Sequence, residues 1–147
     1  MSSVLALDYG TKQIGLALSN SQQKLAFPYG IVENRGFDFV LKEIEKICQK
    51  ENVSVIIIGL PLGLNGQTTE TTKKILKFIK KLKKAIKTKS PAEQKISLTL
   101  EEERLSSKMA QKLLKGSKIK KPDHSLAAML ILENYLIKNL KQNLKQK

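Results

Sequence analysis

The chain has 147 residues, a single cysteine, a single histidine and a formal net charge of +14 at pH 7. A chain of this length is expected to form one domain, here residues 1–147, that buries about two thirds of its unfolded surface. Because Cys48 and His124 are the only residues of their kinds, the sequence excludes an internal disulfide and zinc clusters of cysteine and histidine. A metal site must therefore use oxygen ligands.

Charge and hydropathy also bear on location and partners. No apolar run approaches the roughly 20 residues of a membrane span, and the first residues lack the basic segment of a signal peptide. We therefore expect a cytoplasmic protein with no membrane contact. The positive charge favours nucleic acid as the partner, although a biased genome composition would also produce such a lysine excess.

The first half of the chain predicts three strands, a helix and a further strand. Apolar runs at residues 4–8, 13–19 and 25–32 with turn residues between them predict an antiparallel meander. Apolar side chains then recur at helical spacing from Phe37 to Cys48, so Cys48 is predicted to be a small core residue. A continuous β-branched run at 53–58, closed by Gly59, predicts a buried strand.

A second helix is predicted from Thr68 to about Ile86. Its expected apolar stripe consists of Ile75, Phe78, Ile79, Leu82 and Ile86. Lysines, Lys73 and Lys77 among them, cover much of the remaining surface. Such a charge run is either a solvated face or a track for nucleic-acid phosphates.

The last third predicts a strand at 96–100, acidic residues at 101–103, a helix at 106–115 and a final helix opened by Pro122 and Asp123. The expected apolar set of the final helix is Leu126, Met129, Leu130, Leu136, Ile137 and Leu140. The order of elements predicts an α/β fold. Its five-stranded mixed sheet combines a three-strand meander with two parallel strands, and helices cover both faces.

Three acids stand at predicted element ends: Asp8, Glu103 and Asp123. Sites in open α/β sheets form outside the carboxyl ends of strands, where at least two of these acids could meet. Asp8 ends an apolar run, and because an unpaired buried charge is costly, it needs a cap, a lysine or a metal ion.

Each acid also has a purely structural interpretation. Asp8 could accept N–H bonds within its own turn, Glu103 could pair with a surface lysine, and Asp123 could cap the final helix. His124 follows Asp123, and we expect it to be an exposed first-turn residue, with assistance to a site as the alternative.

Four segments together resemble the YqgF, or RuvX-like, nucleases of the ribonuclease H-like fold. They are LALDYGTKQIGLALS, similar to the family's opening hairpin; IIIGLPLGLNG, its strand and glycine-rich loop; EEERLSS, its Glu-Arg motif; and DHSLAAMLILENYL, its closing helix. All four occur in the family's order and span nearly the whole chain, so the resemblance is specific.

This resemblance implies a metal-dependent nuclease that hydrolyses phosphodiester bonds with one or two Mg²⁺ or Mn²⁺ ions. It assigns catalysis and metal binding to Asp8, Glu103 and Asp123. Contacts with nucleic acid are implied for Lys12 and Arg104 and, through close backbone approach, for Gly63 and Gly66. The charge run on the second helix adds Lys73 and Lys77 to this set.

The family also implies a substrate, the 5′ end of pre-16S ribosomal RNA, and with it ribosomal precursor particles as partners. Resolution of four-way DNA junctions is the alternative within the nucleases, and the sequence does not separate the two. A non-catalytic nucleic-acid-binding module is an alternative of another class. An actin-like kinase lobe is a third, because Asp8 to Lys12 also resembles a phosphate loop, but 147 residues are too few for two lobes.

Overall fold

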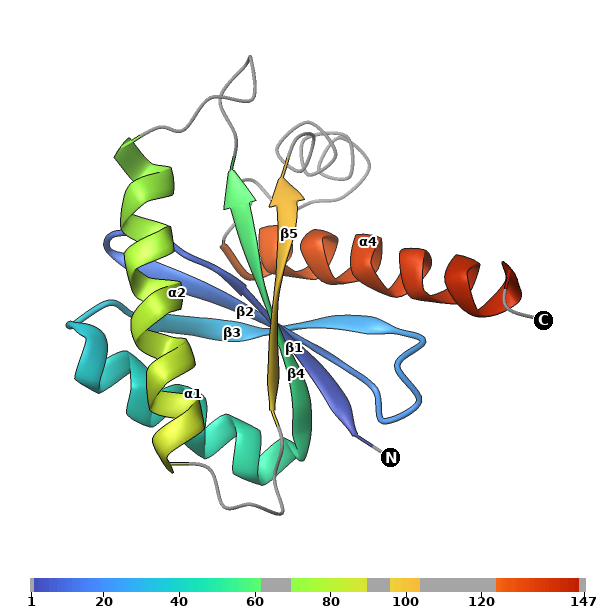
Figure 1. Cartoon of the computed structure of the whole chain (residues 1–147), viewed down its shortest axis with the longest axis horizontal. Helices are drawn as coiled ribbons and strands as arrows, with labels where there is room; N and C mark the ends of the chain where they lie inside the picture. The colour runs from blue at the N-terminus through green and yellow to red at the C-terminus, as the bar shows by residue number, and fades with distance from the viewer. Residues whose placement is uncertain (1, 62–69, 90–95, 104–123, 146–147) are drawn as a thin grey trace.

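The computed structural model describes residues 2–61, 70–89, 96–103 and 124–145, shown in Figure 1. The strands are β1 (Ser3–Asp8), β2 (Gln13–Ser19), β3 (Ala26–Glu33), β4 (Val53–Pro61) and β5 (Ser97–Glu103). The helices are α1 (Phe37–Glu51), α2 (Glu70–Lys89) and α4 (His124–Lys145). The helix predicted at 106–115 lies outside the described residues.

The five strands form one sheet in the order β3-β2-β1-β4-β5. β1, β2 and β3 pair antiparallel, whereas β4 runs parallel to β1 and β5 parallel to β4. Strands that run parallel need a long crossover, and α1 lies in the connection between β3 and β4, as α2 does between β4 and β5. The predicted α/β fold with a meander and two parallel strands is confirmed.

Helices cover both faces of the sheet, with α1 and α2 on one side and α4 on the other (Figure 1). Alternate residues of β1 serve the two faces because side chains along a strand alternate. Leu5 and Leu7 pack with α1 and α2, and Val4 and Ala6 pack against α4. All four side chains are fully buried, so β1 is held rigidly from both sides.

The stripe predicted for α2 is confirmed, since Ile75, Phe78, Ile79 and Leu82 are buried and Ile86 is partly buried. α1 is capped at its C-terminus by Asn52, which has a left-handed backbone and donates its N–H to the carbonyl of Cys48. Among the helices of the described ranges, none combines the length and the apolar character that crossing a membrane requires.

The apolar set predicted for the final helix is partly wrong. Leu130 and Leu136 are buried as expected, but Ile137 is 50% exposed and Leu140 is 45% exposed. The buried stripe runs instead through Ala128, Ile131, Leu132 and Leu136. Residues 126–132 are apolar on every side of the helix, so periodicity alone does not select the face that meets the sheet.

Cys48 is a buried core residue, as predicted. Burial, with a smaller contribution from the nearby Glu45 carboxylate, raises the pKa of its thiol to about 12. Because the thiolate is the reactive form, we expect Cys48 in the folded chain to resist a disulfide reagent at pH 8 and to react at once in denaturant. Rapid labelling of the folded chain, measured by thionitrobenzoate release, would contradict this placement.

Candidate active site

Asp8 ends β1 at the edge of the sheet where the parallel strands β1, β4 and β5 all have their carboxyl ends. Its backbone lies opposite Gly15 of β2, and the preceding Leu7 lies opposite Ile58 of β4. The side chain is 14% exposed. By the alternation along β1, Asp8 belongs to the same face as Val4 and Ala6, which is the face that α4 covers. The nearly buried carboxylate of Asp8 thus lies beside α4, at the end of a rigidly packed strand.

The partner of this carboxylate is His124, the first residue of α4. Nδ1 of His124 lies 2.7 Å from Oδ2 of Asp8, across 116 positions of sequence. Since a carboxylate only accepts hydrogen bonds, Nδ1–H is the donor. The imidazole is 45% exposed, so His124 does lie exposed in the first turn as expected. It is also hydrogen-bonded to Asp8, and the alternative, assistance to a site, stays a prediction.

Two glycines make room for His124. A Cβ added at Gly15 would lie 2.0 Å from the carbonyl oxygen of His124 and 2.6 Å from its Cβ. A Cβ at Gly10 would lie 2.3 Å from the carbonyl oxygen of Gln13 and 3.3 Å from Cε1 of His124. α4 therefore begins in backbone contact with β2, and only glycine at position 15 permits that approach.

A second contact holds α4 against β5, the edge strand of the sheet. Lys138 forms an ion pair and a hydrogen bond with Glu101 of β5, whose side chain is buried. Glu101 lies opposite Gly59 of β4. The lysine compensates its charge, which otherwise would be costly to bury. Glu101 is therefore an anchor for α4.

Of the other predicted acids, the structure describes the backbone of Glu103 alone. Glu103 was expected just past a strand ending at Leu100, but β5 continues through it, and its backbone pairs with Pro61 at the carboxyl end of β4. This puts it at the same edge of the sheet as Asp8. Asp123, Arg104, Gly63 and Gly66 lie outside the described residues, and the convergence of the three acids stays a prediction.

The predicted cationic residues divide between two places. Lys12 is exposed in the turn after β1, where its carbonyl accepts a hydrogen bond from the N–H of Asn34 at 2.9 Å. Lys73 and Lys77 are exposed on α2, on the opposite face of the sheet from His124. The structure thus brings Lys12 to the edge that carries Asp8 and separates the α2 lysines from α4.

Within the described ranges, no three side chains of histidine, cysteine, aspartate or glutamate gather closely enough to hold a metal ion. Asp8 and His124 form a pair at this edge. The remaining ligands predicted by sequence, Glu103 and Asp123, are those whose side chains the structure leaves undescribed.

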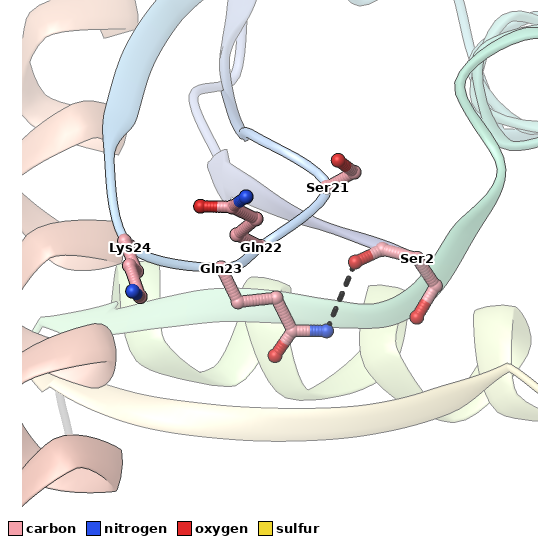
Figure 2. Close-up of a pocket in the computed structure, with 5 residues that line it drawn as sticks. All are labelled: Ser2, Ser21, Gln22, Gln23 and Lys24. Carbon is pink, nitrogen blue, oxygen red and sulfur yellow. Dashed lines mark hydrogen bonds between the residues drawn. The ribbon is translucent and has the colours of Figure 1, made fainter.

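A hollow of about 550 Å³ lies at the opposite end of β1 from Asp8 and is shown in Figure 2. It is lined by Ser2, Ser21, Gln22, Gln23 and Lys24. Gln23 donates from Nε2 to the carbonyl of Ser2 at 3.0 Å. Among the described residues that line it, none carries a carboxylate.

The comparison with protein families identifies the family of this chain. The family model described as RuvX, Holliday junction resolvase, matches residues 2–138. The chain belongs to the RuvX family. That confirms the resemblance drawn from the four sequence segments, and it makes the chain a member of a family of nucleases.

Relatives of similar length carry the name pre-16S rRNA nuclease. One from Rickettsia peacockii (strain Rustic) is 35% identical over 144 residues, which cover 93% of this chain and 88% of the relative. Another from Maridesulfovibrio salexigens is 38% identical over 138 residues, which cover 90% of this chain and 96% of the relative.

Solved structures share the fold at low sequence identity. RuvC of Thermus thermophilus matches with a TM-score of 0.66 at 12% identity, covering 95% of this chain and 96% of that one. The fowlpox virus resolvase in complex with Holliday junction DNA matches with a TM-score of 0.53 at 13% identity, covering 94% and 99%. These likenesses confirm the fold of the RuvX chain.

Sequence reasoning missed Gly15 and did not favour His124 as a partner of Asp8. A glycine within a strand signals a close approach of another backbone, and Gly15 lies between the apolar Ile14 and Leu16 in β2. That signal identifies a contact without naming its partner. The identity of the partner depends on where α4 crosses the sheet.

Proposed function

We propose that this RuvX chain hydrolyses phosphodiester bonds of precursor ribosomal RNA, at the edge of the sheet where Asp8 meets α4. The observation that carries the proposal is the nearly buried Asp8 carboxylate held by His124 at the carboxyl end of β1. The names of the relatives support the RNA substrate. The chain would act in the cytoplasm, with precursor particles of the ribosome as its partners.

A divalent cation fits the donor set at this edge. Among the described residues, His124 bonds to Oδ2 of Asp8, and carboxylate oxygens such as Oδ1 are ligands that suit Mg²⁺ or Mn²⁺. We propose Asp8, Glu103 and Asp123 as the residues that hold it, because Glu103 ends the strand next to β4 and Asp123 precedes His124 in the chain. Bound there, the ion would supply a nucleophile and stabilise charge on the phosphate oxygens.

The chain's own residues would position the ligands of that ion. His124 fixes the rotamer of Asp8 through the 2.7 Å hydrogen bond, and Gly10 and Gly15 allow His124 to approach. Lys12, exposed at the same edge, and Arg104 would contact the phosphates of the substrate strand. His124 is a positioning residue in this account, because it acts through Asp8.

Truncation of His124 tests that positioning role. We expect His124→Ala to lower turnover by about 10- to 100-fold, the usual cost of losing a group that orients a metal-binding ligand. His124→Asn retains an N–H donor on a short side chain and is expected to recover much of the loss. The measurement is single-turnover cleavage at saturating Mg²⁺, and full parental turnover in His124→Ala would contradict the role.

The experiment that tests the function compares two substrates under one set of conditions. Purified chain is incubated with a 5′-extended 16S RNA precursor or with a four-way DNA junction, each with Mg²⁺ and with EDTA. We expect Mg²⁺-dependent cutting of the RNA. Cutting of the junction alone would overturn the substrate in favour of resolution, the activity named in the family description. No cutting of either, in a chain shown to be folded, would overturn the nuclease proposal.

A further inference from the structure

A cationic, aromatic hollow lies on the other face of the sheet, directly behind Asp8. Its volume is about 260 Å³, a little below the roughly 300 Å³ at which pockets for drug-sized ligands begin. Tyr9, the residue after Asp8, forms part of its wall. Because successive side chains of a strand point to opposite faces, Asp8 meets α4 while Tyr9 meets α2.

Three aromatic rings form the apolar part of the hollow. Tyr9 and Phe78 have ring centroids 4.9 Å apart, and Phe37 meets Phe78 edge to face at 5.9 Å. Phe78 is buried, whereas Tyr9 and Phe37 are only partly buried. The cluster therefore presents ring surface to the hollow, and flat rings of this kind are what nucleic-acid bases stack on.

Three lysines of α2 supply the charge. Lys74, Lys77 and Lys81 line the hollow at i, i+3 and i+7, one face of the helix. Nζ of Lys81 lies 5.7 Å from the centroid of the Phe37 ring, which favours its ammonium at that position. Among the described residues that line the hollow, none is acidic, so it selects for an anion.

The beginning of α1 lies beside the hollow. Gly36 is the N-cap of this 15-residue helix and provides no side-chain hydrogen bond to its first N–H groups, which attract anions. Asp38 in the same turn carries a negative charge that offsets part of this attraction. Asn34 fixes the rim, because its Nδ2 donates to the carbonyl of Gly10 at 3.0 Å. The rim is thus tied to the turn that follows Asp8.

We propose that this hollow binds one nucleotide of a single-stranded nucleic acid, with its phosphate at Lys74, Lys77 and Lys81 and its base against Tyr9 and Phe37. That the strand then continues over the edge of the sheet to Asp8 rests on the proposed function. Binding of a nucleotide in the hollow does not, because it needs neither metal nor cleavage.

The probes are adenosine 5′-monophosphate, adenosine, inorganic phosphate and a pentaadenylate RNA, titrated in EDTA into the ¹⁵N-labelled full chain. We expect the monophosphate to shift the amides of Tyr9, Gly36 and Phe37 and to bind more tightly than adenosine or phosphate alone. Equal affinity for phosphate and the monophosphate would overturn the role of the rings. Tighter binding of the pentanucleotide supports a strand; tighter binding of the monophosphate would overturn it in favour of a free nucleotide.

A matched pair of triple variants separates the hollow from the diffuse field of the lysines. Lys74, Lys77 and Lys81 are changed together to Gln, and the control changes Lys80, Lys83 and Lys87, which are exposed on α2 outside the hollow. We expect a loss of at least about tenfold in affinity for the first triple and under about threefold for the control, whose charges act only through the screened field. Equal losses would overturn the proposal.

The same titration keeps the two proposals apart. If the chain cuts no nucleic acid but binds the monophosphate at Tyr9 and Phe37, the proposed function is wrong and the nucleotide site in the hollow is supported. If the chain shows no amide shift with any probe, and the first triple variant still cuts RNA with full efficiency, the nucleotide site is wrong and the proposed function is supported. The thermal midpoint of each variant is measured as well, and we expect the exposed Lys→Gln changes to leave it unchanged.

Discussion

Asp8→Asn is expected to reduce single-turnover cleavage by at least about 100-fold while leaving the chain folded, since a catalytic metal ion supplies charge stabilisation of several kcal/mol that depends on its carboxylate ligands. Asparagine has nearly the same shape, and its amide oxygen can still accept the N–H of His124. It lacks the negative charge that binds a divalent cation. Loss of activity without loss of the hydrogen bond would therefore isolate the carboxylate's charge as the essential property.

Asp38→Asn is the matched control for that substitution. Asp38 is exposed in the first turn of α1 and lies on the face away from α4. Its removal is expected to cost less than about 1 kcal/mol of stability through the helix dipole and to leave turnover near the parental value. An unrelated lysine-rich protein, purified in the same way, shows whether a contaminating nuclease is present. If that protein has no activity and Asp8→Asn retains the parental turnover, Asp8 does not belong to the active site.

Gly15→Ala is expected to have the largest effect on stability. The added Cβ would lie 2.0 Å from the carbonyl oxygen and 2.1 Å from the carbonyl carbon of His124, and backbone atoms cannot rotate away. The start of α4 would have to move by about 1 Å or more, breaking the bond to Asp8. We expect a cost of about 3 kcal/mol or more and a midpoint lower by about 10 °C.

Gly30→Ala provides the contrast on the neighbouring strand. Gly30 lies in β3 opposite Leu16, and a Cβ built there meets no heavy atom within 4 Å. Removing a glycine from a strand reduces the entropy lost on folding, so the thermal midpoint should be unchanged or slightly raised. Thermal unfolding followed by circular dichroism distinguishes the two. Equal midpoints for the two variants would mean that α4 does not start in contact with Gly15.

Local pattern was sufficient for most of the fold. The three apolar runs before Asn34 became β1, β2 and β3 within one residue at each end, because short strands with turn residues between them leave few alternatives. The helical spacing from Phe37 to Cys48 and the stripe of α2 were equally informative, since each has a single apolar face. In α4, residues 126–132 lack a single face, and there the prediction failed.

The candidate site was predictable only in part. Its acids could be recognised at element ends, and Asp8 does lie at the predicted edge. Contacts between distant segments could not be derived from spacing. The bond between Asp8 and His124 spans 116 positions, and the pair of Glu101 with Lys138 spans 37. Both depend on the path of α4 over the sheet, which tertiary packing decides.

Titration of the ¹⁵N-labelled chain with Mn²⁺ tests the central claim most directly, because a bound paramagnetic ion broadens the amide resonances closest to it. The account predicts that Gly10, Gly15 and His124 lose intensity at the lowest concentrations and that Asp8→Asn abolishes this selectivity. Three partly exposed acids of α1, Glu43, Glu45 and Glu51, serve as the reference for unspecific binding. Earlier broadening in α1, or an unchanged pattern in Asp8→Asn, would contradict a metal site at Asp8.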